Sequence, residues 1–206
     1  MNLKQFDTGI GDSNTYVVWG DSKNALIIDC GVKTEEIVSF VNENKLNVKF
    51  IVLTHGHYDH ADNIGEYIKE FPDATPFCHK EELKVLNDPE ANVSRLFTRG
   101  DRRIYDYDYS FLNEGDILTL DSSLSFKILN LPGHTPGCIC LLNESEKVMF
   151  TGDVLFASAY GRTDFMYGSF DDMRASLSRI FNEIDKDTTI YPGHYESAKM
   201  TEIFRY

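Results

Sequence analysis

The 206-residue sequence has few basic residues and no long apolar run. It holds 20 Lys and Arg against 33 Asp and Glu, a formal net charge of −13, and its longest basic run is Arg102-Arg103. A surface of this charge repels phosphate backbones and anionic headgroups, so we expect neither a nucleic-acid partner nor a membrane partner. The N-terminal residues lack an apolar core of signal-peptide length, and no segment is long and apolar enough to span a bilayer.

Cysteine is also scarce. Cys30, Cys78, Cys138 and Cys140 are scattered and do not form the framework of a disulfide scaffold. Without an export signal, we expect reduced thiols in a cytoplasmic protein. Hydrophobic residues at 42% and aromatic residues at 13% are enough for a core and exclude global disorder. The length favours one domain that covers residues 1–206.

Only six histidines occur, and three of them lie in the segment 53–60. The preceding residues, 48–53, are apolar and rich in β-branched side chains, which predicts a buried strand. The following residues, 61–70, have a helical apolar pattern. The three histidines therefore lie in a strand-to-helix turn, where open α/β sheets place their ligand crevices.

The spacing within this turn favours metal binding. In extended backbone His55 and His57 point to the same side, so both can bind one ion. Asp59 and His60 are adjacent and are easier to direct at a second ion nearby. Imidazole and carboxylate suit zinc, iron or manganese, and catalytic sites keep one position open for water. The alternative interpretation, a polar loop with a chance run of histidines, does not explain why half of the histidines gather here.

The pattern of a strand followed by a turn with His or Asp recurs along the chain. Four strand-like segments end in glycine-containing turns that carry His or Asp, at 53–60, 131–134, 150–153 and 190–194. Converging strand ends would bring together seven side chains: His55, His57, Asp59, His60, His134, Asp153 and His194. The sixth histidine, His79, is interpreted as a surface or helix-cap residue and is not nominated as a ligand.

Apolar patterns predict the other elements. Strands are expected at 14–19, 25–30, 76–78, 124–131, 138–142, 147–151 and 188–191. Helices are expected at 35–44, 81–86 and 171–184, the first capped by Thr34. Cys138 and Cys140 are interpreted as small core side chains.

Two features have alternative interpretations. Asp29, at the end of the strand 25–30, either holds a ligand histidine or forms a turn. Residues 88–114 are the least regular stretch of the chain. Their alternating Tyr105, Tyr107 and Tyr109 either line a pocket mouth, pair two subunits or form an edge strand with one aromatic face. The sequence does not indicate the oligomeric state.

These motifs resemble a known family. The run Thr54 to His60 resembles the His-x-His-x-Asp-His motif of the metallo-β-lactamase superfamily, and Gly133-His134, Gly152-Asp153 and Pro192-Gly193-His194 resemble its later metal motifs, in the same order. The runs 132–137, 151–156, 161–164 and 191–194 are most similar to short glyoxalase-II-like hydrolases, which cleave hydroxyacylglutathione.

The resemblance implies an α/β fold, a four-layer αββα sandwich with two metal ions at one edge. By motif position, metal 1 would be held by His55, His57 and His134. Metal 2 would be held by Asp59, His60 and His194. Asp153 would bridge the two ions, and Asp59 and Asp153 would be the catalytic residues. We expect zinc, with iron or manganese as alternatives.

The resemblance also implies a reaction. A hydroxide that bridges the metals would attack the acyl carbon of a small-molecule thioester. Arg162 is a candidate substrate contact, with an ion pair to Asp164 as the alternative. Tyr195 replaces the glycine common after Pro-Gly-His and is a second candidate. The chain stops at Tyr206, short of the helical domain that full-length glyoxalase II adds, so glutathione recognition stays open.

Rival functions share parts of this pattern. Persulfide dioxygenases share the first motif and the runs 133–138 and 161–165, and use one iron with glutathione persulfide and oxygen. The runs 57–60 and 191–194 are more similar to the hydrolases. Three other functions are disfavoured. Flavo-diiron reductases usually have Glu at the position of His57, and a nuclease would need a basic arm to bind nucleic acid. A non-catalytic binding module would not need seven metal ligands.

Overall fold

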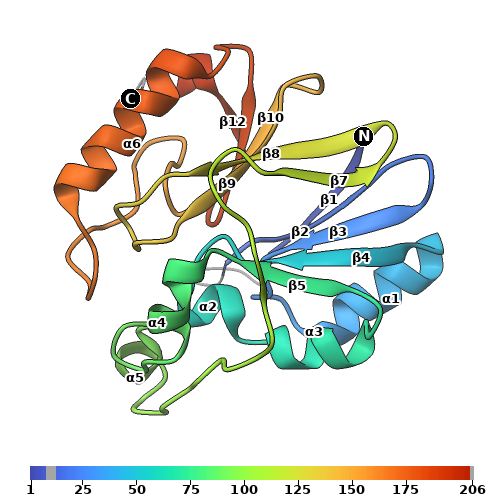
Figure 1. The fold of residues 1–206 in the computed structure, drawn as a ribbon, viewed down its shortest axis with the longest axis horizontal. Helices are drawn as coiled ribbons and strands as arrows, with labels where there is room; N and C mark the ends of the chain where they lie inside the picture. Colours follow the sequence, from blue (N-terminus) through green and yellow to red (C-terminus); the bar gives the residue numbers. More distant parts are fainter. Residues whose placement is uncertain (8–12, 205–206) are drawn as a thin grey trace.

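Two six-stranded sheets form the centre of the structure (Figure 1). The computed structural model describes residues 1–7 and 13–204. The first sheet has the order β1-β2-β3-β4-β5-β6, with β1 Asn2–Phe6, β2 Thr15–Trp19, β3 Asn24–Ile28, β4 Asn47–Val52, β5 Thr75–Cys78 and β6 Ser110–Phe111. The second has the order β12-β11-β10-β9-β8-β7, with β7 Ile117–Asp121, β8 Leu124–Asn130, β9 Ile139–Asn143, β10 Val148–Gly152, β11 Thr189–Pro192 and β12 Ala198–Lys199.

Strand direction brings the predicted turns to one edge. In the first sheet, β3 and β4 are parallel and Ile28 lies opposite Val52, so Asp29 and the turn after β4 begin side by side. In the second sheet, β10 and β11 are parallel and Gly152 lies opposite Pro192. Because the carboxyl ends of parallel strands meet at the same edge of a sheet, each pair delivers two turns to one place.

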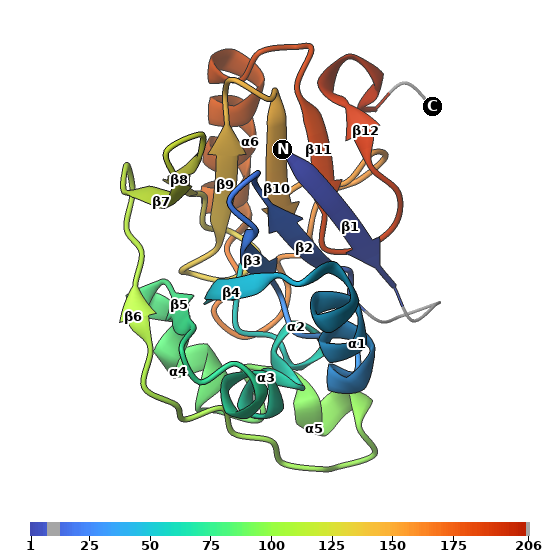
Figure 2. The same ribbon diagram turned by 90° about the vertical axis from the view of Figure 1, so that its right-hand side faces the viewer.

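Helices cover the outer face of each sheet. They are α1 Thr34–Asn44, α2 Tyr58–Ala61, α3 Ile64–Glu70, α4 Leu83–Leu86, α5 Ser94–Phe97 and α6 Phe170–Glu183, with short 3-10 turns η1 Lys80–Glu82 and η2 Met200–Glu202. The ribbon shows α1 and α3 against the first sheet and α6 against the second (Figures 1 and 2). The four-layer prediction is confirmed. No helix of the described residues is long and apolar enough to cross a bilayer.

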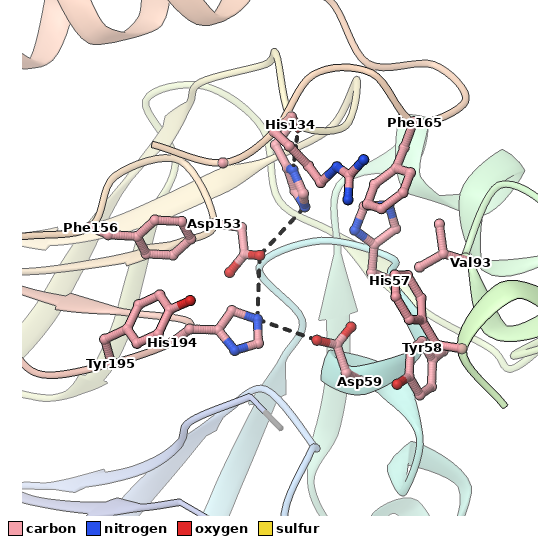
Figure 3. Close-up of a pocket in the computed structure, with 13 residues that line it drawn as sticks. His57, Tyr58, Asp59, Val93, His134, Asp153, Phe156, Phe165, His194 and Tyr195 are labelled. Atoms are coloured by element: carbon pink, nitrogen blue, oxygen red, sulfur yellow. Dashed lines mark hydrogen bonds and ion pairs between the residues drawn. The ribbon is translucent and has the colours of Figure 1, made fainter. Parts of the chain in front are cut away.

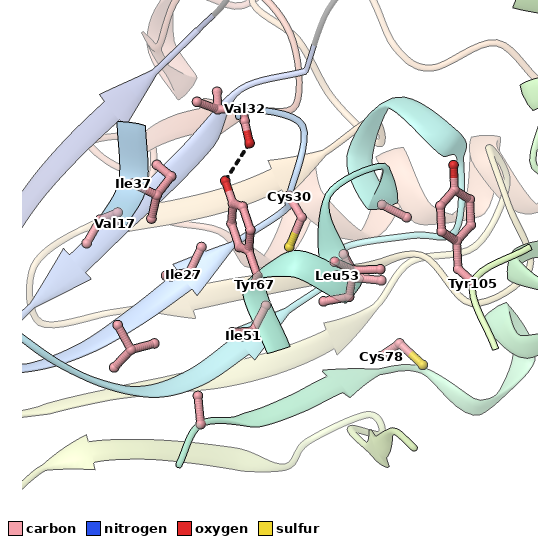
Figure 4. Close-up of a cluster of buried hydrophobic side chains, with 14 of the residues drawn as sticks. Val17, Ile27, Cys30, Val32, Ile37, Ile51, Leu53, Tyr67, Cys78 and Tyr105 are labelled. Carbon is pink, nitrogen blue, oxygen red and sulfur yellow. Dashed lines mark hydrogen bonds between the residues drawn. The ribbon is translucent and has the colours of Figure 1, made fainter. Parts of the chain in front are cut away.

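Three apolar layers hold the sandwich together. Side chains such as Leu26, Ile28 and Phe126 are fully buried between the sheets. The residues next to them on the same strands point to the opposite face of the sheet, toward α1 and α3. In this layer the Tyr67 hydroxyl donates a hydrogen bond to the carbonyl oxygen of Val32 at 2.7 Å (Figure 4). A third layer packs beneath α6. Because both faces of the central strands are buried, their sequences are continuous apolar runs.

Two helix predictions need correction. Thr34 is the first residue of α1 and not its cap. The cap position is Lys33, and the buried Thr34 hydroxyl donates to Glu66 of α3 at 2.9 Å instead. The helix expected at 61–70 is two helices, α2 and α3. Asn63 lies between them, and its side-chain amide donates to the carbonyl oxygens of residues 30 and 31. The start of α1 and the break between α2 and α3 therefore both depend on hydrogen bonds to residues distant in the sequence.

The tyrosines of the irregular stretch do not form a strand. Residues 101–109 have no regular secondary structure. Tyr105 and Tyr109 are buried in the core beside α3, and the Tyr109 hydroxyl donates to the Tyr105 carbonyl oxygen at 3.1 Å. Tyr107 is 41% exposed. The edge-strand interpretation is wrong, because the alternation reflects one loop laid across the helical face of the first sheet.

Candidate metal centre

The seven predicted residues come together at the sheet edge. His55 and His57 follow β4, Asp59 and His60 belong to α2, and His134, Asp153 and His194 follow β8, β10 and β11. Three overlapping groups have ligand atoms within 4.8 Å of one another: His55, His57 and His134; His55, His60 and Asp153; and Asp59, His60 and His194. The first and third groups are the sets expected for metals 1 and 2. By contrast, His79 caps η1, accepting from the Glu81 amide at 3.3 Å.

Asp153 lies between the two sets (Figure 3). Its Oδ2 atom is 3.5 Å from His134 Nε2 and 3.4 Å from His194 Nε2. Its Oδ1 atom is 3.3 Å from His60 Nε2. On the far side, Asp59 Oδ2 lies 3.2 Å from His194 Nε2. Asp153 is thus placed to contact ions held by either set.

Several polar atoms of the cluster are buried without a hydrogen-bond partner among the described residues: His55 Nε2, His57 Nε2, His134 Nε2 and Asp153 Oδ1. An unsatisfied buried polar atom costs about 1–3 kcal/mol. Four such atoms that point into one space fit residues that coordinate a metal ion. Imidazole nitrogen and carboxylate oxygen are donors that zinc, iron and manganese all accept.

Hydrogen bonds fix which nitrogen of the His134 and His60 rings faces the cluster. His134 Nδ1 lies 2.7 Å from the carbonyl oxygen of Arg162, which can only accept, so this nitrogen carries the proton. His60 Nδ1 lies 2.8 Å from an oxygen of the buried Asp29 carboxylate. In both rings Nδ1 therefore carries the proton and Nε2 faces the cluster, which is the orientation that such hydrogen bonds give to histidines in metal sites. The Asp29, Asp153 and Asp59 carboxylates raise the pKa of His60 against the effect of burial, so a bound metal ion would take the place of a proton on its Nε2 atom.

Asp29 also orients His55. Its two oxygens accept from the Thr54 amide at 2.7 Å and the Thr54 hydroxyl at 2.9 Å. Since the Thr54 hydroxyl donates to Asp29, it can accept from His55 Nδ1, which lies 3.2 Å away. Asp29 has a left-handed backbone, with φ 60°, so it forms the turn as well as holding the histidine.

Burial and charge set the protonation of the cluster. Burial lowers the pKa values of His55 and His57 well below the usual value, which keeps both rings neutral and able to bind a cation. At His194 burial lowers the pKa, but the Asp153 and Asp59 carboxylates together raise it to about 10. The two carboxylates therefore favour positive charge in the space that a metal ion would occupy.

A pocket of about 280 Å³ opens onto the cluster. Aromatic side chains form its two walls (Figure 3). On one side, the Phe165 ring lies 5.6 Å from the His57 ring and 6.1 Å from Phe97. On the other side, Phe156 lies 5.8 Å from Tyr195. None of the three tyrosines at 105, 107 and 109 is among the described lining residues.

Both predicted substrate contacts line this pocket. Tyr195 is 75% exposed beside His194. Arg162 donates two hydrogen bonds to Asp164, at 2.7 and 2.8 Å, and its guanidinium group lies 4.0 Å from the centre of the Phe165 ring. The ion pair and the pocket position are therefore both present. Among the described residues that line the pocket, Arg162 is the one Lys or Arg.

The sequence analysis missed several residues around the site. It assigned no role to Asn14. The main-chain amide of Asn14 donates to the carbonyl oxygen of Gly193 at 2.6 Å, and its side-chain amide donates to the carbonyl oxygen of Pro192 at 2.9 Å. Asn14 therefore holds the turn that carries His194. The pocket aromatics Phe97 and Phe165 were also missed. Phe165 ends the run 161–165, which served only as a family motif, and nothing in the local sequence pattern marks Asn14 or Phe97, since their partners are distant in the chain.

The sequence model of the metallo-beta-lactamase superfamily matches residues 8–194. The chain belongs to this superfamily. Among its members, the chain is 35% identical to a hydroxyacylglutathione hydrolase, GloC, of Haemophilus influenzae, covering 94% of this chain and 91% of that protein. The crystal structure of the BLEG-1 B3 metallo-beta-lactamase is similar with a TM-score of 0.88, at 29% identity, over 98% of this chain and 95% of that one.

A further crystal structure, of TTHA1623 in a di-iron-bound form, is similar with a TM-score of 0.85 at 24% identity, over 98% of this chain and 97% of that one. At that identity the similarity shows the fold. The membership and the His/Asp cluster together support a metal-dependent hydrolase.

Proposed function

We propose that the protein is a dinuclear metal-dependent hydrolase that cleaves thioesters of the hydroxyacylglutathione type. The observation that carries this proposal is the position of Asp153 between two complete ligand sets, one of three histidines and one of Asp59, His60 and His194. The name and 35% identity of the Haemophilus influenzae relative support the substrate class.

The ligand sets assign work to each residue. The two sets with Asp153 would hold two divalent ions, which when bound would supply a water of lowered pKa and a Lewis acid for the substrate carbonyl. Asp59 faces the pocket, and its pKa is lowered because the charges of His60 and His194 outweigh the effect of burial. An ionised Asp59 can orient the water and accept a proton from it. We expect zinc, with iron or manganese as alternatives.

The composition of the pocket favours a thioester. Its histidines are His57, His134 and His194, and all three belong to the ligand sets. No further described histidine is left there to protonate a leaving group. A thiolate leaves without a strong general acid, whereas an alkoxide or an amine does not. The aromatic walls suit apolar parts of such a substrate.

A mononuclear iron persulfide dioxygenase is the alternative proposal. It would use two histidines and one aspartate with glutathione persulfide and oxygen, and the motifs at 133–138 and 161–165 favour it. The second ligand set argues against it, because a one-iron enzyme leaves Asp59 and His194 without a role.

The deciding experiment measures metal and activity together. We expect about two ions per chain and hydrolysis of lactoylglutathione, followed by thiol release. His55→Ala and Asp153→Asn should each lower the rate about a thousandfold or more, since metal assistance contributes several kcal/mol. Full activity in either variant at unchanged metal content would refute the site assignment. One iron per chain with oxygen consumption on glutathione persulfide would establish the alternative.

We further propose a cytoplasmic location and a small-molecule substrate. The four cysteines are buried and unpaired in the structure, which suits a reducing compartment. The net charge of −13 disfavours a nucleic-acid substrate. Fractionation of cells that express the tagged protein would test the location.

A further inference from the structure

Glu82 is a buried carboxylate near the site to which neither the ligand sets nor the proposed function assigns a role. It ends η1, outside the ligand turns, and its side chain has no exposed surface. Burial raises its pKa to about 7, against hydrogen bonds that lower it. A carboxylate that is nine-tenths or more buried normally has a compensating structural or chemical purpose.

Both carboxylate oxygens of Glu82 accept hydrogen bonds. Oε2 accepts from the Gly56 amide at 2.6 Å. Oε1 accepts from the Thr135 hydroxyl at 2.7 Å and from the Gly137 amide at 2.6 Å. Gly56 lies between His55 and His57, and Thr135 directly follows His134. One side chain therefore connects the two turns that carry the three-histidine set.

The two turns belong to different sheets. Gly56 follows β4 of the first sheet, and Thr135 and Gly137 follow β8 of the second. Their backbones leave room for the carboxylate only because glycine is present. A Cβ atom at Gly56 would lie 2.9 Å from Glu82 Oε2, and one at Gly137 would lie 2.8 Å from Oε1. Both turns are thus shaped around the Glu82 side chain.

We propose that Glu82 is a positioning residue that sets the distance between His134 and the pair His55 and His57, and so tunes the affinity of the three-histidine metal set. This inference rests on the proposed metal site but assigns a role to a residue outside it. Its hydrogen bonds among the described residues are to Gly56, Thr135 and Gly137 and not to a predicted ligand side chain, and it is not among the described residues that line the pocket. It acts through the main chain of the two turns.

Glu82→Gln tests this proposal, because the amide keeps the volume of the side chain but replaces one acceptor oxygen by a donor. The apo protein is titrated with zinc by calorimetry, with His134→Ala and His194→Ala as references that assign each binding phase. Glu82→Gln should weaken the phase that His134→Ala abolishes by about 10- to 100-fold, as other outer-layer substitutions do. The phase that His194→Ala abolishes should change much less.

A core substitution provides the matched control. Ile180→Val, on the buried face of α6, should lower stability without changing a residue of either turn. It should lower the melting temperature and leave both zinc phases unchanged. If Glu82→Gln lowers the melting temperature in the same way with unchanged zinc affinity, Glu82 is merely structural and the proposal is wrong.

A second variant covers the case in which Glu82→Gln does not fold. Thr135→Val removes one of the three hydrogen bonds and keeps the volume of the side chain. It should weaken the same zinc phase by a smaller factor, and an unchanged phase would overturn the proposal. Absence of zinc binding by the wild-type protein would refute the proposed function as well, so the two failures are distinguishable.

Discussion

The Nδ1 atom of His60 lies 2.8 Å from a carboxylate oxygen of Asp29, and both side chains are buried. The same carboxylate holds Thr54, which contacts the His55 ring. Asp29 therefore orients one histidine from each ligand set. It links the two sets from outside the cluster, whereas Asp153 lies between them.

Asp29→Asn should loosen both rings. A carboxamide has one acceptor oxygen and cannot accept from Thr54 and His60 as the carboxylate does. We expect metal affinity to fall about 10- to 100-fold, with the larger loss in the set that contains His60. Calorimetric titration measures this loss, and the exposed Asp187→Asn is the control. Equal affinities in the wild type and Asp29→Asn would contradict the prediction.

The aromatic walls should control substrate binding and not metal binding. Phe165→Ala and Phe97→Ala each remove part of one wall, and a half-covered phenyl ring contributes about 1 kcal/mol. We therefore expect KM to rise about fivefold for thioesters with apolar groups, at unchanged metal content. Steady-state kinetics measures the change. Phe181→Ala, an exposed ring on α6, should leave KM as it is.

Substitutions of Arg162 and Asp164 should change the KM for an anionic thioester in opposite directions. His134 contacts the main-chain carbonyl of Arg162, so Arg162→Ala should retain its metal. Its KM for an anionic thioester should rise about 1.4- to fivefold, in line with about 0.2–1 kcal/mol for an exposed ion pair. Asp164→Asn releases the guanidinium group and should lower that KM. Both effects should shrink at high salt, and a higher KM in Asp164→Asn would refute this role of the pair.

The cysteines should be inert in the native protein. All four thiols are buried, and burial raises the pKa of Cys78 to about 12. Because the thiolate is the reactive form and a raised pKa suppresses it, almost no Cys78 thiolate exists at pH 8. A chromogenic disulfide reagent should label no thiol in buffer and four in concentrated urea. Rapid labelling of the native protein would show that the core opens readily.

Local patterns were enough to predict the parts of the fold that are local. The strand before His55 and the helix at 171–184 were predicted within about one residue, because apolar periodicity and turn residues act over a few positions. The superfamily and the layered fold are confirmed. The roles of His55, Asp153 and the other five residues as ligands stay predictions, although the structure brings all seven together.

Long-range contacts were not predictable. Alternate tyrosines such as Tyr105 and Tyr109 imitate a strand, but the loop instead packs them against α3. In the sequence, Glu82 looks like an ordinary surface glutamate of a short helix. It is buried and accepts hydrogen bonds because the later residues Thr135 and Gly137 pack against it in the fold. The sequence pattern near Glu82 carries no sign of that partner 53 residues away.

The seven predicted ligands extend along the chain from His55 to His194, the first four after a strand of the first sheet and the last three after strands of the second. During synthesis, a ribosome that has completed the first sheet has exposed four of the seven side chains but neither Asp153 nor His134. Metal loading at the complete centre can therefore follow only the emergence of residue 194.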